Sequence, residues 1–184
     1  MAVLIRLATP GDAASVAAVY RPYVEESAIS FEEIAPDAAE MKRRIAGERP
    51  GYHPWLVAEE EGRILGYAAS APFRTRAAYR WVVETGIYLA ADAGGRGVGH
   101  ALLEQLLSIL ERQGYVAAIG AIALPNPASV ALHEKLGFTY AGTYRRVGFK
   151  GGEWLDVGLW QRDLARRDKV PQEPRAWASV GTFE

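Results

Sequence analysis

The sequence predicts a single α/β or α+β domain in which strands and helices are mixed along the chain. Short β-rich runs are interspersed with segments whose apolar residues recur at helical spacing. The chain has 184 residues, with 49% hydrophobic and 23% charged residues, the balance of an ordinary globular domain. We expect the domain to occupy residues 1–164. The polar stretch 165–184 is expected to be a tail that is mobile or packed on a partner subunit.

The amino-terminal half is expected to contain strands at 3–7, 55–59 and 64–70, the last two joined by a turn at 60–62. Thr9-Pro10 is typical of a helix start, because Thr caps a helix and Pro fits its first turn. A second helix is predicted from Pro36-Asp37 to about Ile45. Residues 72–80 read as a loop rich in Arg and Tyr.

The carboxyl-terminal half begins with a predicted central strand at 81–89, followed by a glycine cluster at 94–99. An amphipathic helix follows, ended by Gly114, and its apolar stripe is Leu102, Leu103, Leu106, Leu107 and Leu110. A buried strand at 116–124 and a short helix from Asn126 to Leu136 come next. A hairpin at 139–149 and 154–160 completes the predicted domain.

The composition argues against several classes of function. Lys plus Arg (21) and Asp plus Glu (22) nearly cancel, so the overall charge indicates neither nucleic acid nor a membrane as partner. There is no cysteine, which excludes disulfides and a thiol nucleophile. The three histidines are not at ligand spacing, so no metal is expected. Neither a signal peptide nor a long apolar span is visible, and we expect a cytoplasmic protein.

The glycine cluster between a strand and a helix is typical of an anion site, because converging N–H groups and the helix N-terminus attract negative charge. A nucleotide P-loop would need Lys-Ser/Thr after the last glycine, but His100 and Ala101 follow Gly99. A dinucleotide fingerprint fails because Leu102 or His100 stands where a small residue is required. The pattern R/Q-x-x-G-x-G/A remains, with Gly94 at its first position. The alternative is a plain glycine-rich turn that leads into a helix.

That pattern and a second one downstream resemble the coenzyme A-binding motifs of the GNAT acetyltransferases. The second motif is an Asn-started helix, Asn126-Pro127-Ala128-Ser129, that ends in Glu134-Lys135-Leu136-Gly137-Phe138. Within that superfamily, residues 3–164 resemble the phosphinothricin and methionine-sulfoximine acetyltransferases. The runs that carry this resemblance are Ser30-Phe31-Glu32, Pro54-Trp55-Leu56-Val57-Ala58-Glu59, Arg76-Ala77-Ala78-Tyr79, Glu84-Thr85-Gly86-Ile87-Tyr88, His133-Glu134, Gly148-Phe149-Lys150 and the run from Trp154 to Gln161.

The resemblance implies the GNAT fold, a central mixed and mostly antiparallel twisted sheet flanked by helices and splayed between the fourth and fifth strands. It also implies acetyl-coenzyme A as cosubstrate and a homodimer. The implied reaction is direct attack on the thioester, in a ternary complex, by the free amine of a small amino-acid analogue such as phosphinothricin, methionine sulfoximine or methionine sulfone.

Site residues follow from the same resemblance. Glu84 matches the family's base, and His133 stands where many relatives carry the Tyr that protonates the departing thiolate; His133 alternatively orients the substrate or the base. An irregularity in the 86–89 strand segment is expected to offer N–H groups to the oxyanion. Coenzyme A is expected at Ile87, Tyr88, Leu89, Gly94, Gly95, Arg96, Gly97, Val98, Gly99, Asn126 and Ser129, and the acceptor at Phe31, Arg74, Arg76 and Tyr79.

Two departures from the family pattern leave alternatives open. Gly94 removes the usual Arg or Gln of the pyrophosphate loop, and Ala123 replaces a frequent Gly, which narrows the expected pocket. The acceptor is alternatively a peptide N-terminus, a polyamine or an aminoglycoside, although an Arg-rich loop suits polycations poorly. A third alternative is a non-catalytic acyl-coenzyme A sensor, which the presence of Glu84 and His133 argues against.

Overall fold

The computed structural model describes residues 3–168 and 170–180 of the chain and contains one seven-stranded sheet. The strand order is β1-β2-β3-β4-β5-β7-β6, with β4 and β5 parallel and the other neighbouring pairs antiparallel. The mixed, mostly antiparallel sheet expected from the sequence is therefore confirmed. The strands are β1 Leu4–Leu7, β2 Trp55–Glu60, β3 Arg63–Pro72, β4 Val82–Leu89, β5 Ala117–Leu124, β6 Thr139–Lys150 and β7 Glu153–Asp163.

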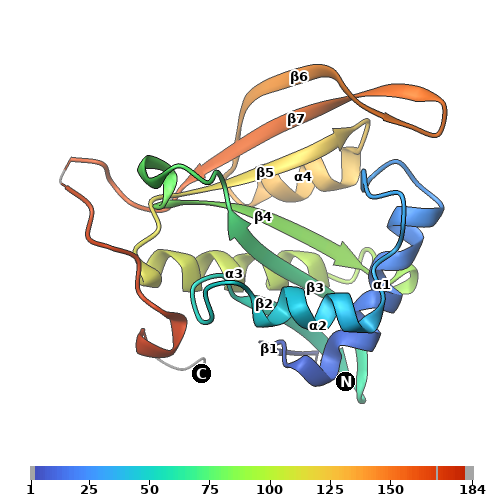
Figure 1. Cartoon of the computed structure of the whole chain (residues 1–184), viewed down its shortest axis with the longest axis horizontal. Coiled ribbons are helices and arrows are strands. Elements are labelled where there is room, and N and C mark those ends of the chain that lie inside the picture. Colours follow the sequence, from blue (N-terminus) through green and yellow to red (C-terminus); the bar gives the residue numbers. More distant parts are fainter. Residues whose placement is uncertain (1–2, 169, 181–184) are drawn as a thin grey trace.

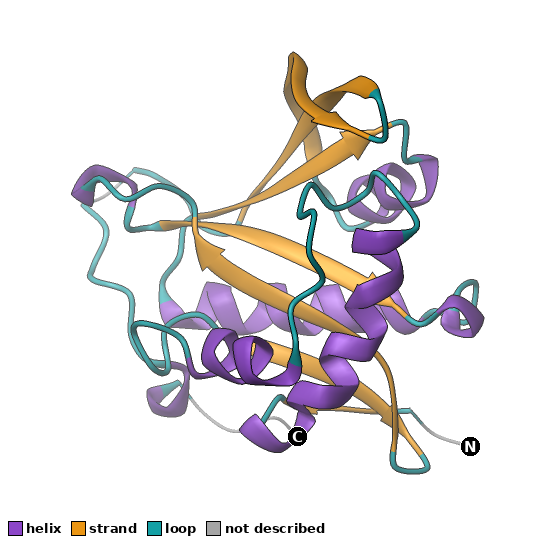
Figure 2. Cartoon of the chain, turned by 45° about the vertical axis from the view of Figure 1, so that its right-hand side comes forward, coloured by secondary structure: helices purple, strands orange, loops and turns teal. Residues whose placement is uncertain are grey.

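Helices cover both faces of the sheet (Figure 2). One face carries α1 Ala13–Glu25 and α2 Ala38–Ala46, and the other carries α3 Val98–Gln113. The alternation of side chains along a strand builds both cores at once. In β2, for example, Leu56 and Ala58 are buried with the leucines of α3, whereas Val57 is buried with α1. The short helix α4, Pro127–Lys135, follows β5 directly.

The sheet splits between its fourth and fifth strands, as the resemblance implied. β4 and β5 are paired from Val82↔Ala117 to Thr85↔Gly120, and the pairing ends there. β4 continues to Leu89 beside β3, while β5 continues to Leu124 beside β7. Figure 1 shows the two strands diverging toward their carboxyl ends. The backbone of β4 beyond Thr85 therefore has one edge without a strand partner.

Three details differ from the sequence-based expectations. The β2–β3 turn contains only Glu61 and Gly62, because Glu60 already pairs with Arg63. Both turn residues have positive φ, which matches a tight hairpin turn. The first helix begins with a 3-10 turn, Pro10–Asp12, before α1. The irregularity expected between Gly86 and Leu89 is absent, because β3 and β4 pair without a register shift from Pro72↔Val83 to Gly66↔Leu89.

The described part of the tail contacts its own chain. Gln113, which is fully buried, donates from Nε2 to the carbonyls of Gly51, Tyr52 and Arg175. The backbone N–H of Trp177 donates to Gly51 O at 2.7 Å. The expectation that the 165–184 segment is mobile or packs on a partner subunit stays a prediction, and residues 169 and 181–184 lie outside the described part.

Candidate active site

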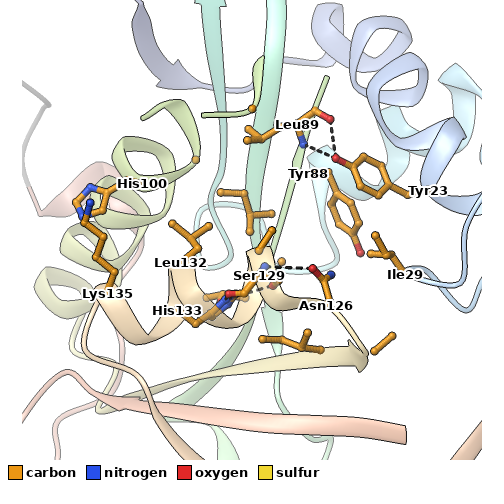
Figure 3. A pocket seen from close by; sticks show the side chains of 18 of the residues that line it. Tyr23, Ile29, Tyr88, Leu89, His100, Asn126, Ser129, Leu132, His133 and Lys135 are labelled. Carbon is orange, nitrogen blue, oxygen red and sulfur yellow. Dashed lines mark hydrogen bonds between the residues drawn. The ribbon is translucent and has the colours of Figure 1, made fainter. Parts of the chain in front are cut away.

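A cleft of about 450 Å³ opens where β4 and β5 separate. Its walls come from the free half of β4, the glycine loop, the end of β5 and one side of α4 (Figure 3). Of the residues predicted to bind coenzyme A, the ones that line this cleft are Ile87, Tyr88, Leu89, Gly94, Gly95, Gly97, Gly99, Asn126 and Ser129. Residues more than 40 positions apart in sequence thus meet in one cavity.

The glycine loop has the backbone of an anion site. Gly95 and Gly97 have φ of 73° and 80°, in the left-handed region that favours glycine, and Gly97 is the N-cap of α3. Gly99 lets α3 approach the sheet, since a Cβ atom there would lie 3.2 Å from a methyl group of Leu89. Gly94 has an ordinary extended conformation, φ −64° and ψ 148°. The loop therefore offers N–H groups and the positive end of α3 to the cleft.

Two of the predicted loop residues, Arg96 and Val98, do not line the cleft. The guanidinium of Arg96 is 2.7 Å from the carboxylate of Glu60, so it anchors the loop to the β2–β3 hairpin. Val98, the first residue of α3, is buried in the core. Their contribution to an anion would come from the backbone alone.

Two basic residues that the sequence reasoning missed face the same end of the cleft. His100 follows Gly99 on the first turn of α3, and Lys135 ends α4 (Figure 3). Nδ1 of His100 lies 3.7 Å from the carboxylate of Glu104, whereas Lys135 forms no salt bridge within the described part of the chain. The position of His100 directly after the last glycine could have indicated that it lines the cleft. Lys135 comes close to the glycine loop only through the packing of α4.

Glu84 lies on β4 just before the split, beside Thr85, which lines the cleft. Its side chain has solvent access, yet enough protein surrounds the carboxyl group that desolvation raises its pKa above the ordinary value. The positive charge of Arg74 opposes this rise. A carboxylate with a raised pKa is suited to accept a proton near neutral pH.

His133 is buried in α4 and lines the cleft. Its Nδ1 lies 2.8 Å from the carbonyl of Ser129, which can only accept, so we assign the proton to Nδ1. Nε2 is then unprotonated, and it is buried with no hydrogen-bond partner. Burial lowers the pKa of His133, and the bond to Ser129 opposes this effect. The neutral ring packs against Gly120, where a Cβ atom would lie 2.7 Å from Nε2.

Asn126 and Ser129 have structural partners as well as a position in the cleft. The side-chain oxygen of Asn126 accepts from the backbone N–H of Ser129 at 3.1 Å, which caps α4. The hydroxyl of Ser129 is 3.4 Å from Nδ1 of His133. Ala123 also lines the cleft, so its methyl group occupies part of the cavity.

The predicted acceptor residues do not form one cluster. Arg74 lies near Glu84 and donates to the hydroxyl of Tyr144 on β6 at 3.2 Å. The ring of Phe31 packs on Gly148 of β6. Tyr79 packs edge-on against Phe73 within the same loop, 5.7 Å between ring centres. Arg76 makes no side-chain hydrogen bond or ion pair with the part of the chain that the structure describes.

Comparisons with known proteins show what the whole chain resembles. Residues 5–159 match the model of the acetyltransferase (GNAT) domain. The phosphinothricin N-acetyltransferase of Streptomyces viridochromogenes is 40% identical, over 94% of this chain and 92% of that protein. An L-methionine sulfoximine/L-methionine sulfone acetyltransferase of Pseudomonas paraeruginosa is 33% identical, over 93% and 100%. The crystal structure of a phosphinothricin acetyltransferase from Sinorhizobium meliloti with acetyl-coenzyme A has a TM-score of 0.89 and 38% identity, over 94% and 95%.

Proposed function

Because the chain belongs to the GNAT acetyltransferase family, we propose that it acetylates the free amine of a small amino-acid analogue of the phosphinothricin or methionine sulfoximine type. It is an acetyl-coenzyme A-dependent N-acetyltransferase. The observation that carries the proposed acceptor is the 40% identity to a phosphinothricin N-acetyltransferase over almost the whole of both chains. The cleft at the split of the sheet supports this proposal, although Glu84 itself is not among the residues that line it.

Glu84 is the proposed general base. An α-ammonium group cannot attack a thioester until it loses a proton, and the raised pKa of Glu84 suits it to take that proton directly or through water. The neutral amine then attacks the carbonyl carbon of the acetyl group. The C–S bond breaks, the amide forms, and coenzyme A leaves as a thiolate that takes up a proton.

His133 is proposed to orient the reacting groups, which is one of the two roles considered from the sequence. Its Nδ1–H is engaged by the carbonyl of Ser129, and its lowered pKa keeps Nε2 unprotonated at neutral pH. An unprotonated Nε2 accepts a hydrogen bond but has no proton for the thiolate. The geometry therefore argues against the general acid role for His133.

Coenzyme A is proposed to lie along the split. The free edge of β4 at Ile87 and Leu89 would pair with the amides of the pantetheine arm, as an added strand does. The glycine loop would hold the pyrophosphate, with Lys135 supplying positive charge in place of the Arg or Gln absent at Gly94, and with the His100 ring beside it. We propose no oxyanion donors at the irregularity expected in the 86–89 segment, because β4 pairs regularly with β3 and the outward N–H groups of Ile87 and Leu89 are assigned to the pantetheine arm.

The acceptor is proposed to bind on the side of Glu84 that faces Arg74 and β6. Arg74 and Arg76 would bind its carboxylate and second anionic group, and Phe31 and Tyr79 would form apolar walls. An arginine-rich pocket favours anionic amino acids over polyamines and aminoglycosides.

A homodimer is proposed through the β6–β7 hairpin. The hairpin exposes large apolar side chains to an unusual degree: Tyr140 59%, Tyr144 46%, Val147 55%, Phe149 57% and Trp154 55%. Such a patch is typical of a protein–protein interface. Light scattering after size-exclusion chromatography tests this, since Trp154→Glu should convert a dimer to a monomer.

None of the described helices is long and apolar enough to cross a bilayer. We propose that the enzyme works in the cytoplasm.

The test of the acceptor class is thiol release from acetyl-coenzyme A with a panel of amines. The panel contains phosphinothricin, methionine sulfoximine, methionine sulfone, spermidine, an aminoglycoside and a short peptide. We expect turnover on the amino-acid analogues alone. Turnover confined to another amine would overturn the proposed acceptor, and binding of acetyl-coenzyme A without turnover on any amine would favour the sensor alternative.

A further inference from the structure

The hydroxyl of Tyr23 occupies the open edge of β4. It donates to the carbonyl of Leu89 at 2.7 Å and accepts from the backbone N–H of the same residue at 3.2 Å (Figure 3). One side-chain group thus satisfies both backbone groups of one strand residue. Tyr23 belongs to the last turns of α1, far from β4 in the sequence, and no sequence motif indicated this contact.

The direction of the Leu89 groups follows from the pairing of β3 with β4. The N–H of Ala90 donates to Leu65 O, so Ala90 directs its backbone groups toward β3. Neighbouring residues in an antiparallel ladder direct theirs to opposite edges. Leu89, opposite Gly66, therefore points its N–H and C=O away from β3 and toward the split, where β5 has already diverged.

Leu89 is also a residue at which the pantetheine arm is proposed to pair. From this conflict we infer that Tyr23 is a positioning residue that closes the β4 edge in the free enzyme and exchanges its place with the pantetheine amides when the coenzyme binds. The inference rests on the proposed placement of the cofactor along β4. A strand edge left open would expose unpaired backbone groups to water or to another chain, which the Tyr23 hydroxyl prevents.

A groove beside Tyr23 has room for its ring. A separate groove of about 730 Å³ lies along α1 and the start of β3, and Tyr23, Ile29 and Leu89 form the wall between it and the cofactor cleft. The ring is half-buried and packs edge-on against Tyr88, with 5.1 Å between ring centres. A swing of Tyr23 toward the groove would free Leu89 without unfolding α1.

The backbone of the same turn of α1 contacts the acceptor side. The carbonyl of Tyr23 accepts from the hydroxyl of Ser27 at 2.8 Å, and the carbonyl of Val24 accepts from Nζ of Lys150 at 2.6 Å. These bonds tie the end of α1 to the loop that carries Phe31 and to β6.

The experiment compares Tyr23→Phe with Tyr20→Phe in the full chain, by calorimetric titration with coenzyme A. Tyr20 lies one turn earlier, and its hydroxyl bonds to Ser30 and Glu32 rather than to β4. Tyr23→Phe removes the hydroxyl that competes with coenzyme A for the backbone of Leu89. The Kd of this variant for coenzyme A should therefore fall roughly 3- to 10-fold, which corresponds to one or two net hydrogen bonds. Tyr20→Phe should bind as the unmodified protein does. General structural damage would weaken binding, so tighter binding is specific to the inference.

A second readout separates the inference from the proposed cofactor placement. The backbone amide signal of Leu89 in nitrogen-15 NMR spectra should shift when coenzyme A saturates the unmodified protein. If it shifts while Tyr23→Phe binds with equal or lower affinity, the role of Tyr23 is overturned and the cofactor placement stands. If it does not shift at saturation, the pantetheine does not pair at Leu89, and both the placement and the inference fail.

Discussion

The ring of Phe31 lies directly on the backbone of Gly148, so closely that a Cβ atom at position 148 would overlap the ring. The contact joins the loop after α1 to the carboxyl-terminal end of β6. Lys150 strengthens the same junction, because its Nζ donates to the carbonyls of Val24, Ser30 and Glu32 at 2.6 to 2.8 Å. One wall of the proposed acceptor pocket therefore depends on a glycine and a lysine of the β6–β7 hairpin.

Gly148→Ala should displace Phe31 and disturb that wall. Overpacking of this kind costs about 1–3 kcal/mol of folding free energy, so the melting temperature should fall. Because the displaced Phe31 would no longer form the wall, we expect the KM for the amino-acid acceptor to rise about tenfold while the KM for acetyl-coenzyme A is unchanged. Steady-state kinetics with each substrate varied in turn measure both. Adding Phe31→Ala to Gly148→Ala should remove the overlap and restore the melting temperature. Equal changes in both KM values would place Phe31 outside the acceptor pocket.

Arg74→Ala should change the pH dependence of catalysis. Burial raises the pKa of Glu84, and the charge of Arg74 opposes that rise, so removing the charge lets the pKa increase further. A general base works only when ionised, and the acidic limb of the kcat/KM profile should therefore move to higher pH. Arg76→Ala is the matched control, which should raise the KM for the acceptor without moving the limb. An unmoved limb in Arg74→Ala would argue that Glu84 is not the titrating group.

Gly94→Arg should strengthen acetyl-coenzyme A binding. The residue has φ −64°, and the nearest atom to an added Cβ would be Ala91 O at 4.0 Å, so an arginine fits without strain. A new charge-assisted contact to the pyrophosphate should lower the KM for acetyl-coenzyme A roughly 3- to 10-fold. Gly97→Ala should have the opposite effect, because φ is +80° there. A Gly94→Arg enzyme with an unchanged KM would place the pyrophosphate elsewhere.

Asp12→Asn should destabilise the fold in a pH-dependent way. Asp12 accepts from Arg6 at 2.7 and 2.8 Å and from Thr9, and the bonds to Arg6 hold its pKa well below the usual range, against the desolvation that raises it. A lowered pKa stabilises the folded state above the unfolded pKa of about 3.9, and this contribution is lost as the pH falls through the folded pKa. We expect a loss of about 2–3 kcal/mol at pH 7 in urea unfolding. A similar loss at pH 7 and pH 2 would contradict the ionic origin.

The sequence predicted the parts of the site that depend on local pattern. The spacing of Gly97 and Gly99 and the amphipathic stripe of α3 are properties of consecutive residues, and the cleft contains both glycines where expected. What it did not predict depends on packing between distant elements. The contact of Tyr23 with Leu89, the three carbonyls bound by Lys150 and the ion pair of Arg96 with Glu60 each join segments at least 36 residues apart. Regular pairing of β4 likewise overrode the irregularity that Gly86 permits.

The central claim is that Glu84 removes the proton of the acceptor amine at the split of the sheet. It is tested most directly by the kcat of Glu84→Gln with phosphinothricin at saturating acetyl-coenzyme A. The account predicts a fall of at least ~100-fold, the usual contribution of a general base. The affinity for coenzyme A should be unchanged, and the melting temperature should not fall, because the raised pKa of Glu84 means that its ionised form disfavours folding above its unfolded pKa. A folded variant with near-normal turnover would contradict the account and remove Glu84 from the mechanism.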